Sequence, residues 1–157
     1  MKVLMVCLGN ICRSPLAEGI LRHKLKQRNL DVEVDSAGTA AYHTGEPPDL
    51  RSIETALKHG IDIRRQRARK FNSQDFKRFD RIYAMDRSNY ADLLARATEP
   101  ADQEKVDLIL NLVKPGINAE VPDPYYGGRD GFSKVFQMLD QACGILVEEI
   151  AEKVKSL

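Results

Sequence analysis

A cysteine and an arginine six residues apart enclose a short turn near the start of the chain. Residues 7–15 have the sequence CLGNICRSP and follow directly on the apolar run Val3-Leu4-Met5-Val6, so a buried strand is expected to turn into a helix here. Such a turn directs several backbone N–H groups and the positive end of the helix at one point, where an anion can bind. The same field favours the thiolate of Cys7, and Arg13 can grip two phosphate oxygens at once. The segment therefore predicts a phosphate cradle with Cys7 as its nucleophile.

The residues between these two predict how the cradle is shaped. Gly9 allows a close approach of the backbone, and Asn10 tolerates a left-handed conformation and is expected to hold the loop rather than to react. Ser14 can donate to the sulfur or cap the helix, in which Pro15 suits the first position. The predicted phosphate-binding residues are Leu8, Gly9, Asn10, Ile11, Cys12 and Arg13. The Cys-x5-Arg spacing alone is a weak signal, and the structural alternative is a small buried Cys7 at a strand end.

A second segment, residues 122–128 with the sequence PDPYYGG, also carries side chains suited to chemistry. Prolines on both sides of Asp123 stiffen the chain and would hold its carboxyl group in place. A carboxyl group held in this way can serve as a general acid, although a plain turn with a solvated acid explains the pattern equally well. Tyr125 and Tyr126, if they line the phosphate site, would favour a flat phenyl ester over a serine phosphate.

Together these segments resemble the low-molecular-weight protein tyrosine phosphatases, and the resemblance covers nearly the whole chain. Residues 7–15 resemble the active-site loop of that family, and residues 123–127 resemble its Asp-Pro-Tyr-Tyr segment. Weaker matches occur in the family's order at Ser36-Ala37-Gly38-Thr39, Gly45, Pro48-Asp49, His59-Gly60-Ile61, Met85-Asp86 and Asn89.

The resemblance implies hydrolysis of phosphotyrosine in proteins through a phosphocysteine intermediate on Cys7. It implies that Arg13 and the loop N–H groups bind the phosphate, that Asp123 is the general acid and then the general base, and that Ser14 assists the sulfur. Tyr42 falls where related proteins place an aromatic wall. The expected walls of the substrate pocket are Leu8, Tyr42, Tyr125 and Tyr126.

Other polar residues are expected to be structural. Asp49 and Asp86 stand at predicted helix starts, where capping is the simpler explanation. Glu18 has no evident role. The basic run at residues 64–70 is interpreted as a solvated face, because no aromatic residues interleave with it.

Three alternative functions stay open. Arsenate reductases of this fold use the same cradle, but they need further cysteines, and residues 81–89 contain none. Protein arginine phosphatases of the same family tend to carry Thr where this chain has Ile11. A non-enzymatic phosphate-binding module would need neither Cys7 nor Asp123.

Bulk properties limit the remaining possibilities. The chain of 157 residues has the size of one domain, residues 1–157, and its net charge of +1 indicates neither a nucleic-acid nor a membrane partner. No signal peptide is recognised, so a reducing cytoplasm is expected, with the three cysteines as thiols. No zinc-type cluster is present, and no metal or other cofactor is predicted. Whether Cys7 and Cys12 form a disulfide under oxidation stays open.

The elements that must position these residues alternate between strand and helix. Strands are expected at 1–6, 32–34, 81–85 and 106–110, and helices at 15–27, 49–59, 86–97 and from 132 onward, with a short helix around Phe76 and a long loop at 114–131. An apolar stripe from Phe132 to Val154 makes the last helix the clearest. The pattern predicts an α/β fold, a single doubly wound domain with a four-stranded parallel sheet and helices on both faces.

Overall fold

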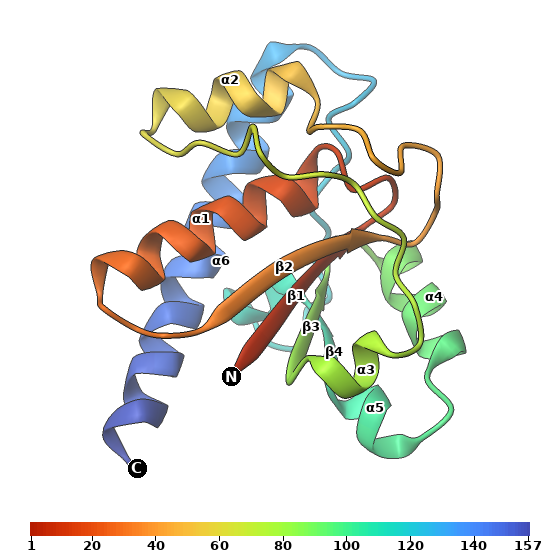
Figure 1. Ribbon diagram of the computed structural model, residues 1–157, viewed down its shortest axis with the longest axis vertical. Helices are drawn as coiled ribbons and strands as arrows, with labels where there is room; N and C mark the ends of the chain where they lie inside the picture. The colour runs from red at the N-terminus through yellow and green to blue at the C-terminus, as the bar shows by residue number, and fades with distance from the viewer.

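The computed structural model describes residues 1–157, except for the side chain of Arg129. Four parallel strands form one sheet in the order β2-β1-β3-β4, and helices cover both of its faces (Figure 1). The strands are β1 (Lys2–Cys7), β2 (Glu33–Gly38), β3 (Arg81–Ala84) and β4 (Val106–Leu108). The predicted α/β fold with a four-stranded parallel sheet is confirmed.

Strand β1 lies in the interior of the sheet and is buried on both faces. Val3 and Met5 pack into one core, whereas Leu4 and Val6 pack into the other, because successive side chains of a strand point to opposite faces. Strand β1 pairs with β2 along one edge and with β3 along the other. Its carboxyl end, where Cys7 lies, is at the edge where open α/β sheets bind ligands.

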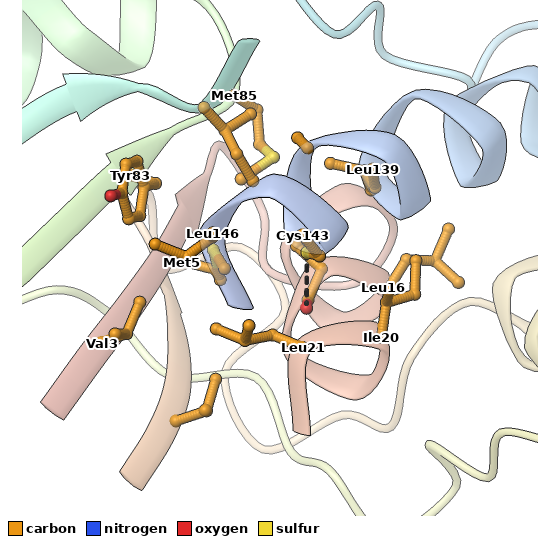
Figure 2. Packing of buried hydrophobic residues seen from close by; sticks show 14 of the residues in the cluster. Val3, Met5, Leu16, Ile20, Leu21, Tyr83, Met85, Leu139, Cys143 and Leu146 are labelled. Atoms are coloured by element: carbon orange, nitrogen blue, oxygen red, sulfur yellow. Dashed lines mark hydrogen bonds between the residues drawn. The ribbon is translucent and has the colours of Figure 1, made fainter. Parts of the chain in front are cut away.

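The helices divide between the two faces of the sheet. On one face α1 (Arg13–Gln27) and α6 (Arg129–Lys155) pack together, and α2 (Leu50–Lys58) lies against both. Figure 2 shows this core, in which Leu16, Ile20, Leu21, Leu139, Cys143 and Leu146 surround Val3 and Met5 of β1. The other face is covered by α3 (Asp75–Arg78) and α4 (Arg87–Arg96), and α5 (Pro100–Glu104) lies against β4. No helix among the described residues has both the length and the apolar character needed to cross a membrane.

Several predicted boundaries were wrong. Helix α1 begins at Arg13, so Pro15 is its third residue rather than its first. The chain after Leu108 forms a 3-10 helix, η1 (Ile109–Leu112), where a longer strand was expected. Helix α5 was not predicted because five residues are too few to show a periodic apolar stripe. Helix α6 begins at Arg129, ahead of the stripe that predicted it.

Candidate active site

The phosphate loop, residues 7–13, turns its carbonyl groups toward the rest of the protein. The carbonyl oxygens of Cys7, Leu8 and Ile11 accept backbone N–H groups from outside the loop at 2.9, 3.0 and 2.8 Å. The N–H groups of residues 9–12 donate to no acceptor among the described residues. Four donors are therefore left for an anion in the middle of the loop, which is the arrangement that a phosphate cradle needs.

Asn10 holds this loop in shape. It has φ = +58°, a left-handed conformation that asparagine adopts more readily than most residues. Its Nδ2 donates to the Oγ atoms of Ser14 at 2.8 Å and Ser36 at 2.9 Å, and its Oδ1 accepts the N–H of Arg69 at 3.0 Å. One buried amide thus ties the loop to α1, to β2 and to the segment that follows residue 68.

The sulfur of Cys7 lies 3.0 Å from Ser14 Oγ, and both residues are buried. Ser14 Oγ accepts a hydrogen bond from Asn10, which leaves its own hydrogen free to be donated to the sulfur. The chain of bonds continues behind Asn10, where Ser36 Oγ donates to Glu18 Oε1 at 2.6 Å. Because the carboxylate of Glu18 can only accept, Ser36 donates to it and accepts from Asn10. Asn10 also donates to Ser14, so the hydroxyl hydrogen of Ser14 is left to point at the Cys7 sulfur.

Glu18 was given no role from the sequence, but the structure places it at the buried end of this chain. Its second oxygen pairs with Arg22 Nη1 at 2.7 Å, one turn along α1. Burial raises the pKa of Glu18, although the bonds to Ser36 and Arg22 act in the opposite direction.

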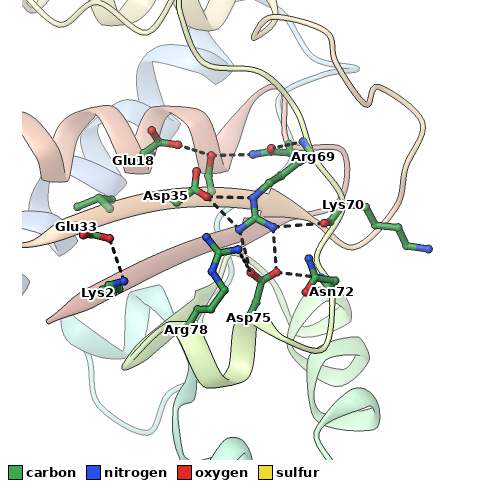
Figure 3. A network of polar contacts seen from close by, with 12 residues as sticks. Lys2, Glu18, Glu33, Asp35, Arg69, Lys70, Asn72, Asp75 and Arg78 are labelled. Carbon is green, nitrogen blue, oxygen red and sulfur yellow. Dashed lines mark hydrogen bonds and ion pairs between the residues drawn. The ribbon is translucent and has the colours of Figure 1, made fainter.

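A second polar cluster supports Asn10 from the far side. Arg69, whose N–H donates to Asn10, pairs through its guanidinium with Asp35 on β2 and with the fully buried Asp75 on α3 (Figure 3). The Nη atoms lie 3.0 and 3.2 Å from the two oxygens of Asp75. The segment that carries Arg69 is therefore fixed to strand β2 and to helix α3 before it reaches the loop.

Arg13, at the end of the phosphate loop opposite Cys7, is buried. Its Nη1 donates to Asp86 Oδ2 at 2.7 Å and to the Val121 carbonyl at 3.0 Å, which occupies both hydrogens of that nitrogen. Burial alone would lower the pKa of Arg13, but the charges of Cys7, Asp86 and Asp123 outweigh it and raise that pKa. The remaining donors of the guanidinium are left for an anion.

The interpretation of Asp86 as a cap alone was incomplete. Its Oδ1 does accept the N–H of Asn89 at 2.8 Å and caps α4, but its Oδ2 pairs with Arg13. Asp49 also caps its helix, since its Oδ1 accepts the N–H of Arg51 at 2.8 Å. In addition the N–H of Asp49 donates to Ile11 of the phosphate loop at 2.8 Å.

Asp123 comes from far along the chain and faces the same point. Its Oδ2 lies 3.6 Å from Arg13 Nη2, and its Oδ1 accepts the N–H of Tyr125 at 3.0 Å. Its side chain is about one-third exposed, so it can reach both a bound ligand and water. The segment before it is fixed by the Val121 N–H, which donates to the Met85 carbonyl at 2.9 Å.

These side chains enclose a cavity of about 270 Å³. Its floor is Cys7 and Arg13, and its outer wall is apolar and aromatic; Tyr126 and Tyr42 are the most exposed of these residues, at 91% and 78%. The lining residues are Cys7, Leu8, Gly9, Ile11, Cys12, Arg13, Tyr42, His43, Asp123, Tyr125 and Tyr126. Asn10 and Ser14 support the loop from behind. No group of three or more His, Cys, Asp or Glu within the described part of the chain could hold a metal ion.

His43 is a lining residue that the sequence analysis missed. Its Nδ1 lies 2.6 Å from Glu46, and its ring lies 6.4 Å from that of Tyr125. A Cβ atom on Gly9 would stand 3.1 Å from the ring of His43, so the small residue lets the two segments approach. A single histidine in a loop carries no spacing pattern that could have indicated this position.

All three cysteines are free thiols in this structure. The pKa of Cys12 is raised to about 12 by burial and by the nearby charges of Asp49, Cys7 and Asp123. The pKa of Cys143 is also raised to about 12, because it is buried in α6. Both thiols are therefore protonated near neutral pH, and neither competes with Cys7 as the resting nucleophile.

Comparison with known proteins points to one family. The family model described as low molecular weight phosphotyrosine protein phosphatase matches residues 2–156. A low molecular weight phosphotyrosine protein phosphatase of Schizosaccharomyces pombe is 43% identical over 143 residues, which are 88% of this chain and 90% of the yeast protein.

Solved structures agree. A protein tyrosine phosphatase of Entamoeba histolytica, crystallised with Hepes in the active site, superposes with a TM-score of 0.91 at 39% identity and covers 98% of both chains. An arginine phosphatase of Drosophila superposes with a TM-score of 0.88 at 35% identity, covering 95% of this chain and 97% of its own. The chain therefore belongs to the low molecular weight phosphotyrosine protein phosphatase family, whose members are hydrolases.

Proposed function

We propose that this chain hydrolyses phosphotyrosine in proteins through a phosphocysteine intermediate on Cys7. The observation that carries the proposal is the convergence of Cys7, Arg13 and Asp123 on one cavity, with Ser14 behind the sulfur. The whole chain, residues 1–157, would serve as one phosphatase domain. A nucleophilic thiolate needs a reducing compartment, so we expect the enzyme to act in the cytoplasm.

In the first step the thiolate of Cys7 attacks phosphorus. A sulfur–phosphorus bond forms while the bond from phosphorus to the phenolic oxygen breaks, and protonated Asp123 gives its proton to that oxygen. The free donors of Arg13 and the N–H groups of residues 9–12 hold the other three oxygens as charge redistributes.

In the second step water cleaves the phosphocysteine. Asp123, now a carboxylate, accepts a proton from the attacking water, and the sulfur–phosphorus bond breaks to release phosphate. The hydrogen bond from Ser14 stabilises the departing thiolate of Cys7.

Two sets of variants test these roles. Cys7→Ser should abolish turnover while phosphate still binds, and near-normal turnover would remove Cys7 as the nucleophile. Asp123→Ala should slow the release of phenol, whose pKa is about 10, far more than that of an activated leaving group. General acid catalysis contributes about 10²–10⁴-fold, so the loss of kcat/KM on phenyl phosphate should lie within that range. Equal losses on both esters would remove Asp123 from the acid role.

The cavity walls favour a phenyl ring over other phosphorylated groups. Leu8, Tyr42, Tyr125 and Tyr126 offer flat apolar contacts above the cradle.

Two alternative functions are weaker. An arsenate-reductase relay needs further cysteines, but residues 81–89 contain none and Cys143 is buried in α6. A simple phosphate-binding module would not turn over para-nitrophenyl phosphate, which this chain is expected to hydrolyse without added metal.

The resemblance to the Drosophila arginine phosphatase makes phosphoarginine the one substrate alternative worth testing. Ile11, which lines the cavity, is an apolar wall that suits a phenyl ring rather than a guanidinium group. Ile11→Thr should therefore raise the ratio of the rates on phosphoarginine and phosphotyrosine peptides. An unchanged ratio would mean that Ile11 does not set substrate choice.

A further inference from the structure

Arg51, in the first turn of α2, joins three parts of the structure that surround the cavity. Its Nε and Nη2 each lie 3.0 Å from the two oxygens of Asp49, which makes a two-pronged ion pair. Its Nη2 also donates to the carbonyl of Tyr125 at 3.1 Å. The guanidinium lies 4.6 Å from the centre of the Phe132 ring on α6 and 5.5 Å from the Tyr125 ring. Such stacking fixes the plane of the group.

We propose that Arg51 is a positioning residue that holds the acid loop, residues 121–128, over the phosphate loop. The proposal rests on the proposed function, because it assigns to Arg51 the task of placing Asp123. Arg51 does not line the cavity itself, so it acts through the backbone that carries the acid.

The inner end of this link is fixed to the phosphate loop. The N–H of Asp49 donates to the carbonyl of Ile11 at 2.8 Å, and its carboxylate, which is only 13% exposed, binds Arg51. Hydrogen bonds from Arg51 outweigh the effect of burial and lower the pKa of Asp49, so the pair stays ionised near neutral pH. The connection therefore runs from Ile11 through Asp49 and Arg51 to Tyr125.

The outer end reaches the acid within two residues. The N–H of Tyr125 donates to Asp123 Oδ1 at 3.0 Å, while its carbonyl accepts from Arg51. Pro122 and Pro124 have no N–H to offer, and the Gly127 N–H bonds inside the loop to the Pro124 carbonyl. Apart from the Arg13–Asp123 pair, the bond from Arg51 is the one polar tether between residues 122–127 and the rest of the described molecule.

The chain contains a matched control for this motif. Arg64 grips Asp62 two residues before it with the same atoms, at 3.0 Å from Nε and 2.9 Å from Nη2, and its N–H also donates to Asp62 Oδ1. The guanidinium of Arg64 has no third acceptor among the described residues and lies outside the cavity lining. Removing Arg64 therefore removes the ion pair without touching the acid loop.

The test measures kcat/KM for a series of aryl phosphates with leaving-group pKa values from about 7 to 10. A displacement of about 1 Å can cost about 100-fold in rate, so Arg51→Ala should lose about 10- to 100-fold on phenyl phosphate. The loss on the most activated ester should stay below about threefold, because that ester needs little proton donation. Arg51→Lys should resemble Arg51→Ala, since an ammonium cannot form the fork, and Arg64→Ala should match wild type on every ester.

Two further measurements keep the outcome clear. Thermal unfolding and vanadate binding are recorded for each variant, and Arg51→Ala should bind vanadate as wild type does because the phosphate loop is intact. In the Asp123→Ala background, Arg51→Ala should cause no additional dependence on the leaving group. Weakened vanadate binding, or an equal loss on all esters, would overturn the positioning role of Arg51.

The same variants separate the role of Arg51 from the role of Asp123. If Asp123→Ala shows a steep dependence on the leaving group and Arg51→Ala does not, Arg51 has no part in placing the acid, and only the role of Arg51 is refuted. If Asp123→Ala itself shows no such dependence, Asp123 is not the acid, and both roles are refuted.

Discussion

Asp86 makes one contact with each of its carboxylate oxygens, and two substitutions can separate them. Oδ1 caps α4 through the N–H of Asn89, and Oδ2 pairs with the buried guanidinium of Arg13. Asp86→Asn keeps an oxygen for the cap but places an amide beside Arg13. Asp86→Ala removes both contacts.

The expected losses follow from the burial of the two partners. Breaking a buried ion pair by removing one partner costs about 3–5 kcal/mol. The lower end applies here, because Asp86 is 20% exposed and Val121 still accepts from Arg13. The free energy of unfolding should therefore fall by about 3 kcal/mol in Asp86→Asn. Asp86→Ala should lose about 1 kcal/mol more, which is the usual contribution of a helix cap.

Urea unfolding with and without phosphate measures both effects. The unpaired charge of Arg13 gains a new partner when phosphate binds, so phosphate should bind Asp86→Asn more tightly than wild type. Bound phosphate should therefore reduce the loss in the free energy of unfolding of this variant. Catalysis should still decline, because the guanidinium is no longer held at a fixed angle. Weaker phosphate binding by Asp86→Asn, or a loss of stability below about 1 kcal/mol, would refute the ion-pair argument.

Two further predictions concern buried groups around the phosphate loop. Burial raises the pKa of Glu18, so the folded state holds this proton more tightly than the unfolded chain does, and the stability of wild type should fall as pH rises through the raised pKa. Glu18→Gln should lack this fall in urea unfolding followed upward from about pH 4.3, the usual pKa of glutamate, and parallel profiles would contradict the assignment. After peroxide and then dithiothreitol, wild type should recover activity through a Cys7–Cys12 disulfide while Cys12→Ser does not; equal recovery would show that Cys12 gives no protection.

The parts of the fold that depend on periodicity were predictable from sequence. The apolar run before Cys7 indicated a doubly buried strand, and β1 is buried on both faces. The long stripe beginning at Phe132 predicted α6, which packs on the sheet. Helix α5 was missed because it has no stripe; Pro100 at its first position was the one local signal.

The phosphate loop could be predicted because its residues are contiguous in sequence. Its supports could not, since Asp86, Arg51 and His43 reach the site only through the tertiary fold. Asp86 also has a sufficient local explanation, capping of α4, that conceals its second contact with Arg13. A sequence pattern indicates what a residue can do nearby, whereas the long-range partner depends on how the strands are ordered in the sheet.

The burial of β1 implies that the side chains of Cys7 and Asp123 differ in how freely they move. The amides of Val3 to Val6 are paired or covered on every side, so their hydrogen exchange with solvent should require unfolding of the whole domain. Cys7 extends directly from this slowest-exchanging segment. Asp123 lies on a loop with few tethers, which can open without disturbing a single sheet hydrogen bond. In the proposed mechanism the nucleophile is thus fixed to the least mobile part of the protein, and we expect admission of substrate and release of phosphate to depend on movement of the segment that carries the acid.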